Sequence, residues 1–289
     1  MAPEYAHAWL PKATCDESCM RANLIDEPGR FTRTFRTTSR IAMAITLLTL
    51  APLLGIPLPG RVRWQRGYCR LMLRCLGVRI SVSGGPIRDI RGSLVVAGHV
   101  SWVDVFAIGA VLPGSFVARA DLIDWPGLGV IARMMRVIPI ERGNLRTLPR
   151  VVGTVAARLQ AGQTVVAFPE GTTWCGRAYG SFRPAMFQAA IDAQRPVQPL
   201  RLTYHHLNGE LSTVPAYVGE DTLMASIRRL TATRMTVAHI RVAGLQLPGE
   251  SRRDLAARCE VAVRAGEQIP QVHSHHHPEH PERPEPIAA

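Results

Sequence analysis

From residue 78 onward, short apolar runs typical of buried strands alternate with stretches of helical periodicity. A strand that is apolar at every position is buried on both faces, and a helix between two strands allows them to pair in parallel. The alternation therefore predicts an α/β domain with a mostly parallel central sheet flanked by helices. The strand-like runs are residues 79–84, 94–97, 116–118, 137–140, 164–168, 197–203 and 240–242, and the helical stretches are 102–112, 148–160, 185–193 and 251–268.

The sequence outside this alternation divides the chain into four parts. We expect an irregular N-terminal arm over residues 1–28 and a basic and apolar, membrane-anchoring helical segment over residues 29–77. The α/β domain follows over residues 78–270, and a His- and Pro-rich tail over residues 271–289 is expected to be disordered. His-rich tracts can bind transition metals, but no such role is expected of this tail.

An uncharged and almost wholly apolar run, Ile41 to Leu58, lies between two basic flanks. Its length is at the lower limit for a transmembrane helix. Pro52, Gly55 and Pro57 interrupt its second half, and arginines on both sides give no orientation. A helical hairpin that enters one leaflet, with Tyr68 to Leu76 in its second arm, is the favoured interpretation. A single span and a soluble core helix stay open as alternatives.

The charge of the chain is strongly basic, with a formal net charge of +12, and Lys12 is the only lysine among 34 basic residues. Such an excess attracts polyanions, although the use of arginine also fits genome composition. The sequence has no recognition helix, zinc-finger spacing or aromatic-interleaved basic strand. We therefore expect an anionic membrane surface as partner, and no nucleic acid.

The six cysteines include no Cys-x2-Cys pair, and residues 1–26 lack the apolar stretch of a signal peptide. Reduced thiols in a protein that faces the cytosol are therefore expected. Cys15 and Cys19 could hold a metal ion or form a redox pair. Two thiols in a weakly structured polar segment are the preferred interpretation, and no metal site is expected.

Two polar motifs, each directly after a strand-like run, indicate acid–base chemistry. His99 and Asp104 form the first, and Glu170, Gly171 and Thr172 follow about 65 residues later. Because parallel strands end at one edge of a sheet, the two motifs should meet there. A neutral imidazole that a carboxylate orients can take a proton from a hydroxyl near neutral pH. A buried structural histidine beside an unrelated helix-start aspartate is the alternative for the first motif alone.

Two further elements have a weaker chemical signal. Arg142 and Gly143 follow a third strand-like run, and a guanidinium offers a planar fork of donors that matches phosphate oxygens. A solvated surface arginine is the alternative. The fourth element, residues 197–200, is an apolar strand interrupted by proline that we expect to line the site without taking part in proton transfer.

In this order and spacing, the four elements resemble the glycerolipid acyltransferase family, the enzymes related to 1-acylglycerol-3-phosphate acyltransferase. The elements are HVSWVD at residues 99–104, IPIERG at 138–143, FPEGTT at 168–173 and VQPL at 197–200. The resemblance covers roughly residues 78–205. It implies transfer of an acyl group from acyl-CoA or acyl carrier protein to a lipid hydroxyl, with no cofactor and no metal.

The resemblance also implies roles for individual residues. His99 would be the general base that takes the proton from the acceptor hydroxyl as this hydroxyl attacks the thioester carbonyl. Asp104 would hold the His99 tautomer and stabilise the imidazolium that develops. Arg142 would bind the phosphate of the acceptor, whereas Glu170 and Gly171 would shape the acceptor site.

The third motif departs from the pattern of the phosphatidate-forming members, which commonly continue it with arginine and serine. This chain has Thr173 and Trp174 at those positions, and Thr172 before them would add a polar contact. The Thr-Thr form resembles members that acylate other lyso-lipids, including lyso-ornithine lipid. Arg177 or Arg183, a few residues further on, could restore the positive charge, and both acceptor types stay open.

The sequence thus predicts a membrane-associated O-acyltransferase with a lyso-lipid acceptor and an acyl thioester donor. The first candidate for the acceptor is 1-acylglycerol-3-phosphate, which would give phosphatidate in phospholipid synthesis. Another lyso-lipid (lyso-ornithine lipid or a glycolipid) and a non-catalytic membrane-surface binding protein are the alternatives. We expect the protein at the cytoplasmic face of the cell membrane, held peripherally or monotopically through its N-terminal segment.

Overall fold

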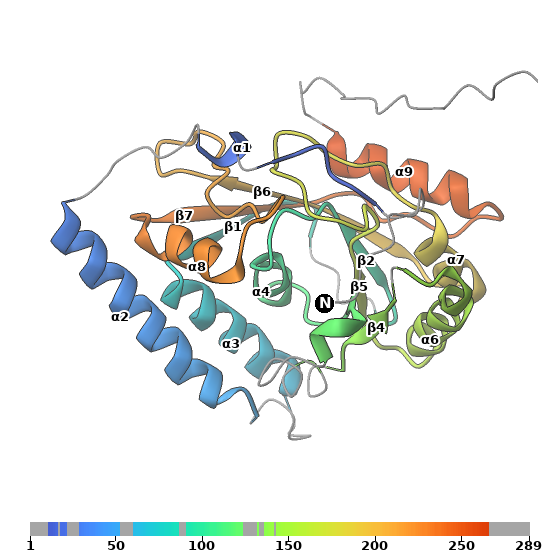
Figure 1. Ribbon diagram of the computed structural model, residues 1–289. Helices are drawn as coiled ribbons and strands as arrows, with labels where there is room; N and C mark the ends of the chain where they lie inside the picture. The colour runs from blue at the N-terminus through green and yellow to red at the C-terminus, as the bar shows by residue number, and fades with distance from the viewer. Residues whose placement is uncertain are drawn as a thin grey trace, which may run out of the picture.

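The computed structural model describes residues 11–16, 18–21, 29–52, 60–86, 91–123, 132, 136–141 and 143–265. Over these residues the chain forms an α/β fold with a central seven-stranded sheet between helices (Figure 1). The strands are β1 (Val78–Gly84), β2 (Leu94–Ala97), β3 (Ser115–Arg119), β4 (Ile138–Ile140), β5 (Val165–Ala167), β6 (Val197–His205) and β7 (Thr236–Val242). The helices are α1 (Ser18–Arg21), α2 (Arg30–Thr49), α3 (Arg61–Cys75), α4 (Asp104–Gly109), α6 (Leu148–Gln160), α7 (Ala185–Asp192), α8 (Leu223–Ala232) and α9 (Arg252–Arg264), with short 3₁₀ turns at η2 (Ala120–Ile123) and η3 (Leu145–Thr147).

The sheet has the strand order β1-β7-β6-β2-β5-β3-β4 and is mixed rather than wholly parallel. Of the pairings between the described strands, only that of β6 with β7 is antiparallel. The chain leaves β6 at His205, and Val237 of β7 pairs with that residue, so β7 starts at the end of the sheet where β6 stops. The segment that contains α8 therefore stays at one end of the sheet, whereas a parallel connection would cross it. The prediction of a mostly parallel sheet is confirmed for the block from β6 to β4.

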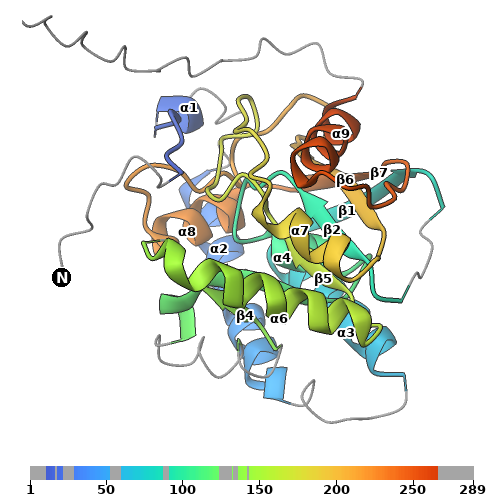
Figure 2. The ribbon, with the colours of Figure 1, turned by 90° about the vertical axis from the view of Figure 1, so that its right-hand side faces the viewer.

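Helices cover both faces of the sheet (Figure 1, Figure 2). Strand β2 shows how the two cores are separated, because successive side chains of a strand point to opposite faces. Val95 and Ala97 belong to the apolar cluster with α2, α3, α4 and α8. Leu94 and Val96 belong to the cluster with α6, α7 and α9. All four positions of β2 are buried, which explains the continuous apolar run in the sequence.

The N-terminal helices α2 and α3 lie side by side against the α/β domain (Figure 1). Arg40 donates to the carbonyl groups of Thr231 at 2.9 Å and Thr233 at 2.6 Å, and Arg36 donates to Ala232 at 3.1 Å. These carbonyls end α8, where unpaired acceptors and the helix dipole both favour a cation. Part of the segment that the sequence assigned to a membrane anchor is therefore joined to the domain.

The apolar run at residues 41–58 is helical as far as Thr49, and residues 53–59 lie outside the described part of the chain. Within the described ranges, no helix is both long and apolar enough to cross a membrane. Helix α2 overlaps the first arm of the expected hairpin at residues 41–49, and α3 contains residues 68–75 of the second arm. Insertion of these helices into a leaflet stays a prediction.

The described part of the N-terminal arm, residues 11–16 and 18–21, packs on the domain. Cys15 and Met20 are buried in the cluster with α2, α3, α4 and α8. The Thr213 hydroxyl donates to the Cys19 carbonyl at 3.0 Å. The tail at residues 271–289 lies outside the described residues, so its expected disorder stays a prediction.

Candidate active site

The turn between β2 and α4 brings His99 and Asp104 together. His99 Nδ1 lies 2.8 Å from Asp104 Oδ2, and the same oxygen accepts hydrogen bonds from the backbone N–H groups of Val100 at 2.7 Å and Ser101 at 2.9 Å. The Asp104 side chain is fully buried, whereas that of His99 is 16% exposed. A buried carboxylate needs such donors to offset the loss of water. The turn thus holds the carboxylate below an imidazole that solvent can reach.

The contact with Asp104 determines which nitrogen of His99 can act as a base. A carboxylate only accepts hydrogen bonds, so Nδ1 carries the proton and Nε2 is the basic nitrogen. The ring of Phe168 stacks on the imidazole with centroids 4.0 Å apart and planes inclined by 11°. The imidazole is therefore held both in its plane and in its tautomer.

Tyr204 also contacts Asp104, a role that the sequence motifs did not predict. Its O–H donates to Asp104 Oδ1 at 2.6 Å from β6, 100 residues further along the chain. Burial, followed by the charge of Asp104, raises the pKa of the Tyr204 phenol well above its usual value. Tyr204 shares a face of β6 with Leu200 and Leu202 in the cluster next to α4. A tyrosine on the inward face of an apolar strand is the signal that could have identified it.

Glu170 joins the third motif to the first. Its Oε2 accepts the backbone N–H of His99 at 2.8 Å, and the N–H of Trp174 donates to the carbonyl of His99 at 2.7 Å. Both backbone polar groups of His99 are thus held by the segment that follows β5. Burial raises the pKa of Glu170 to about 8, against the opposing effect of the His99 N–H.

The raised pKa of Glu170 predicts a stability that depends on pH. The folded protein holds this proton more tightly than the unfolded chain, so the stabilisation is complete below pH 4.5 and is lost as the pH rises through about 8. The contribution to the slope is at most about 1.4 kcal/mol per pH unit. We expect Glu170→Gln to flatten the decline in urea-unfolding free energy between pH 5 and pH 8, whereas Glu250→Gln at an exposed position should not change it. If the unfolding free energy of Glu170→Gln declined with pH as steeply as that of the wild type, the raised pKa of Glu170 would be contradicted.

Gly171 has a left-handed backbone with φ of 75°, which favours glycine. A Cβ at this position would lie 2.8 Å from Pro11 Cγ and 3.6 Å from Arg183 Cδ. The backbone N–H of Arg183 donates to the Pro169 carbonyl at 3.0 Å. The structure therefore brings Arg183 and the N-terminal arm to the third motif, beside Glu170.

The threonines after Gly171 have different surroundings. Thr172 is half-buried in the same turn, and the Thr173 hydroxyl donates to the carbonyl of Tyr217. The N–H of Tyr217 in turn donates to the carbonyl of Val100 at 3.0 Å. Thr173 thus links the third motif to the first through the Tyr217 segment.

The second and fourth sequence elements begin in strands β4 and β6 of the same sheet. Arg142 lies outside the described residues, so its phosphate-binding role stays a prediction, although β4 ends at Ile140 on the same edge as β2 and β5. In the fourth element, Pro199 pairs with Val96 inside the sheet. The Gln198 amide donates to the Ala243 carbonyl at 2.8 Å, and both contacts support the strand.

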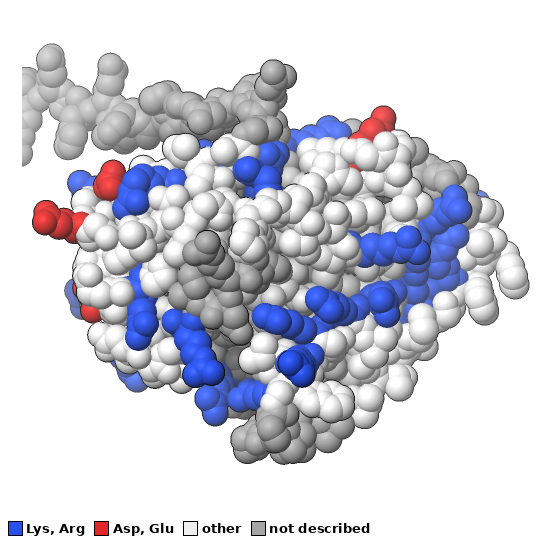
Figure 3. Space-filling model, turned by 180° about the vertical axis from the view of Figure 1, so that it is seen from behind, with Lys and Arg blue, Asp and Glu red and all other residues white. Residues whose placement is uncertain are grey.

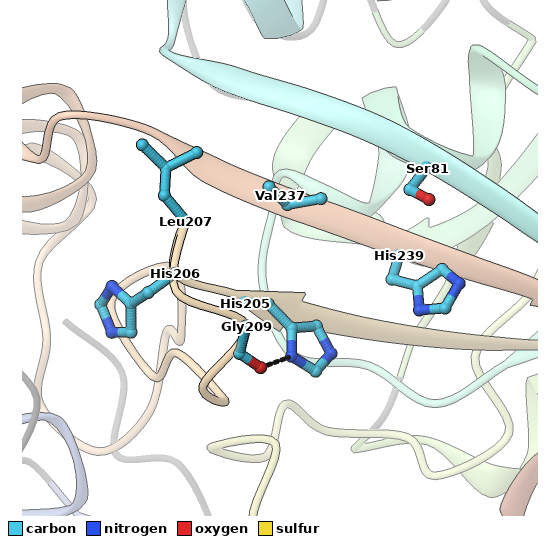
Figure 4. Close-up of a pocket in the computed structure, with 7 residues that line it drawn as sticks. All are labelled: Ser81, His205, His206, Leu207, Gly209, Val237 and His239. Carbon is cyan, nitrogen blue, oxygen red and sulfur yellow. Dashed lines mark hydrogen bonds between the residues drawn. The ribbon is translucent and has the colours of Figure 1, made fainter.

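Figure 4 shows the residues that line a surface hollow of about 380 Å³, and none of them belongs to the four sequence motifs. His205 Nδ1 lies 3.0 Å from the Gly209 carbonyl, and its Nε2 lies 2.9 Å from Thr203 Oγ1, so both ring nitrogens have partners. His205 is next to Tyr204 in β6 and therefore points to the other face of the sheet. The hollow is lined by Ser81, His205, His206, Leu207, Gly209, Val237 and His239.

Comparison with known proteins identifies the class of this fold and site. The Acyltransferase family model matches residues 79–203. A 1-acyl-sn-glycerol-3-phosphate acyltransferase of Neisseria meningitidis is 33% identical over 198 residues, which are 68% of this chain and 77% of that protein. A lyso-ornithine lipid O-acyltransferase of Pseudomonas aeruginosa is 30% identical over 208 residues, which are 71% of this chain and 79% of that protein.

A solved structure shows the same fold. The crystal structure of the 1-acyl-sn-glycerophosphate acyltransferase PlsC from Thermotoga maritima superposes with a TM-score of 0.60 at 18% identity. The superposition covers 81% of this chain and 95% of the PlsC chain. The chain belongs to the glycerolipid acyltransferase family, and it is an O-acyltransferase, as the sequence motifs predict.

Proposed function

We propose that the protein transfers an acyl group from acyl-CoA or acyl carrier protein to the hydroxyl of a lyso-lipid at a membrane surface. The observation that carries this proposal is the His99–Asp104 pair at the end of β2, with a distance of 2.8 Å between Nδ1 and Oδ2. A thioester is already activated toward acyl transfer, so the protein has to supply a base and a place for the acceptor. The buried carboxylate and the partly exposed imidazole meet the first requirement.

The reaction follows from the geometry in two proton transfers. His99 Nε2 removes the proton of the acceptor hydroxyl while the hydroxyl oxygen bonds to the thioester carbonyl carbon. Asp104 stabilises the imidazolium that forms. The carbon–sulfur bond then breaks, and the imidazolium returns its proton to the departing thiolate. The products are an acylated lipid and a thiol, and His99 is neutral again.

For the acceptor, we propose 1-acylglycerol-3-phosphate first. Relatives with that name match the chain at 33% identity, and Arg183 beside Gly171 offers a guanidinium for a phosphate. Lyso-ornithine lipid is the second candidate. Thr173 supports this second candidate, because the Thr173 hydroxyl donates a hydrogen bond to the Tyr217 carbonyl and the side chain brings no positive charge to the third motif.

Helices α2 and α3 carry the features of a membrane-docking surface. Large apolar side chains are exposed on them, with Phe31 at 87%, Phe35 at 68% and Trp64 at 66%. Arginines alternate with these residues, and Figure 3 shows that Lys and Arg greatly outnumber Asp and Glu on the face that it presents. Apolar side chains beside basic ones favour the interface of an anionic membrane. We propose that the protein binds the cytoplasmic face of the cell membrane in this way.

An acceptor panel tests the proposed function. The purified protein is incubated with acyl-CoA or acyl carrier protein and with lysophosphatidate, lyso-ornithine lipid, lysophospholipids or a lyso-glycolipid. We expect lysophosphatidate to be the best acceptor, and Arg183→Ala to weaken its use about tenfold while Arg253→Ala on α9 does not. Preference for lyso-ornithine lipid without dependence on Arg183 would favour the second candidate. Absence of product with every acceptor would contradict acyl transfer and leave a membrane-surface binding protein.

Tyr204→Phe tests whether the second donor to Asp104 supports catalysis. Removal of a hydrogen bond to a charged group costs about 1.5–3 kcal/mol, so we expect kcat to fall roughly tenfold or more with KM little changed. Tyr68→Phe is a matched control, because that hydroxyl donates to the Leu47 carbonyl at 3.3 Å in α2. Equal kcat values for Tyr204→Phe and Tyr68→Phe would show that Tyr204 has no such role.

A further inference from the structure

Three cysteines from two distant parts of the chain converge next to the third motif. Cys15 and Cys19 come from the N-terminal arm, and Cys175 comes from the segment that follows Thr173 and Trp174. Their sulfur atoms all lie within 4.8 Å of one another. Cys15 and Cys175 are buried, whereas Cys19 is partly exposed. The two thiols of the arm, for which the sequence predicted no role, therefore lie beside a third thiol.

From this cluster we propose that Cys15, Cys19 and Cys175 bind a thiophilic divalent cation, Zn²⁺ in the first place, which fastens the N-terminal arm over the acceptor side of the active site. Thiolate sulfurs bind zinc at about 2.3 Å, and tetrahedral ligands are then roughly 3.8 Å apart. Sulfurs within 4.8 Å need to move by only about an ångström to reach that arrangement. Cys19 is partly exposed, so solvent would supply a water molecule as the fourth ligand.

Backbone N–H groups favour anionic sulfur at Cys175, whereas the Cys175 side chain and burial raise the pKa of the Cys15 thiol. The N–H groups of Arg177 and Ala178 are directed to the Cys175 sulfur, and the N–H of Cys175 is directed to the Cys15 sulfur. Gly176, with φ of 85°, makes the turn that allows the following N–H groups to face Cys175. Metal-bound sulfurs are thiolates and accept such hydrogen bonds. A disulfide would use two of the sulfurs, would carry no charge and would leave the third thiol unused.

The position of the cluster shows what the bound cation would do. Pro11 lies against Gly171 in the third motif, and the Thr213 hydroxyl donates to the Cys19 carbonyl at 3.0 Å. A cation shared by Cys15, Cys19 and Cys175 would therefore cross-link the arm to the segment that follows Glu170. Without the cation, the arm would be held only by its apolar packing and by the Thr213 contact, so it would leave the acceptor side of the site more easily.

Cobalt titration tests the cluster directly. The full-length protein, treated with chelator and reductant, is titrated with Co²⁺ and then with Zn²⁺. We expect one equivalent of Co²⁺ to give the near-ultraviolet absorption of thiolate-to-cobalt charge transfer, and Zn²⁺ to abolish it. Imidazoles of the His-rich segment do not give this absorption. Cys15→Ser, Cys19→Ser and Cys175→Ser should lose it, whereas Cys75→Ala and Cys259→Ala, both outside the cluster, should keep it.

The single lysine of the chain gives a second measurement that does not depend on enzyme activity. Lys12 is exposed and follows Pro11, so a lysine-specific protease can cut the chain only in the arm. Zn²⁺ should slow this cut in the wild-type protein, and Cys19→Ser, which changes a partly exposed position, should lose the protection. In the cobalt titration, absence of the thiolate band, or a band of equal strength in Cys19→Ser, would overturn the proposal. Cleavage at Lys12 that Zn²⁺ does not change would also overturn it. So would a Cys15–Cys175 disulfide found by differential alkylation of the isolated protein.

Discussion

Replacement of His99 by alanine is expected to lower kcat for acyl transfer by about 10²- to 10⁴-fold, the usual contribution of a general base. The reason is chemical, because no other imidazole lies on Asp104 to take the proton of the acceptor hydroxyl in the described part of the chain. Membrane binding and folding should be retained. The contacts of His99 with Glu170 and Trp174 are made by its backbone and survive the substitution.

The measurement for His99→Ala is the initial rate of acylated-lipid formation at saturating acceptor. His239→Ala is the matched control, because His239 lines the surface hollow and its Nε2 lies 2.8 Å from the Ser83 hydroxyl, away from Asp104. We expect wild-type rates from His239→Ala. A rate within a factor of about two of the wild type for His99→Ala would rule out His99 as the base, because that difference is worth less than 0.5 kcal/mol by the roughly 1.4 kcal/mol per tenfold scale.

Asp104→Asn is expected to lower kcat by about 100-fold or more, since the imidazolium would lose a buried charge partner. The fold should tolerate this change. The asparagine oxygen can still accept from His99 and the backbone N–H groups, and its amide can donate to the Tyr204 oxygen once the hydroxyl rotates. The defect should therefore be one of rate with a melting temperature close to that of the wild type.

A second substitution separates charge from packing at this position. Asp104→Ala leaves the Tyr204 hydroxyl and the N–H groups of Val100 and Ser101 without their acceptor. We expect a destabilisation of about 1–3 kcal/mol for each buried donor that stays unpaired. Asp254→Asn, at an exposed ion pair on α9, should change neither rate nor stability. If Asp104→Asn retained the wild-type rate, the stabilisation of the imidazolium by Asp104 would have to be abandoned.

The strands could be predicted from the sequence because a strand that is buried on both faces is a continuous run of apolar residues. Val95 and Val96 face different cores, yet both positions must be apolar, so the run at residues 94–97 could be identified without the fold. The direction of β7 could not be predicted in this way. It depends on where the segment with α8 ends relative to β6, which periodicity does not encode.

The parts of the candidate site that follow strands of the parallel sheet were predicted, and the contact that comes from within a strand was missed. His99 and Asp104 share one turn, so their pairing follows from spacing and a helix start. Tyr204 reaches the same carboxylate from a strand 100 residues away, and only the alignment of β6 beside β2 makes that contact. Glu170 was expected to shape the acceptor site, and the structure also shows that it holds the backbone of His99.

The N-terminal arm shows the same limit. Cys15 and Cys19 are only a pair of thiols in the sequence, and the third sulfur comes from a segment about 150 residues later. No local pattern connects them. The arm also supplies Pro11 to the third motif, so a region expected to be irregular contributes to the surroundings of the active site.

We propose that His99 acts as a base for direct attack by the lipid hydroxyl and does not itself carry the acyl group. The most direct test is to incubate the protein with acyl thioester alone, then measure free thiol and the mass of the intact protein. We predict an unmodified mass and no stoichiometric burst of thiol until lyso-lipid is added. An acyl adduct that forms with a burst of one thiol per chain, and that His99→Ala abolishes, would show instead that His99 carries the acyl group.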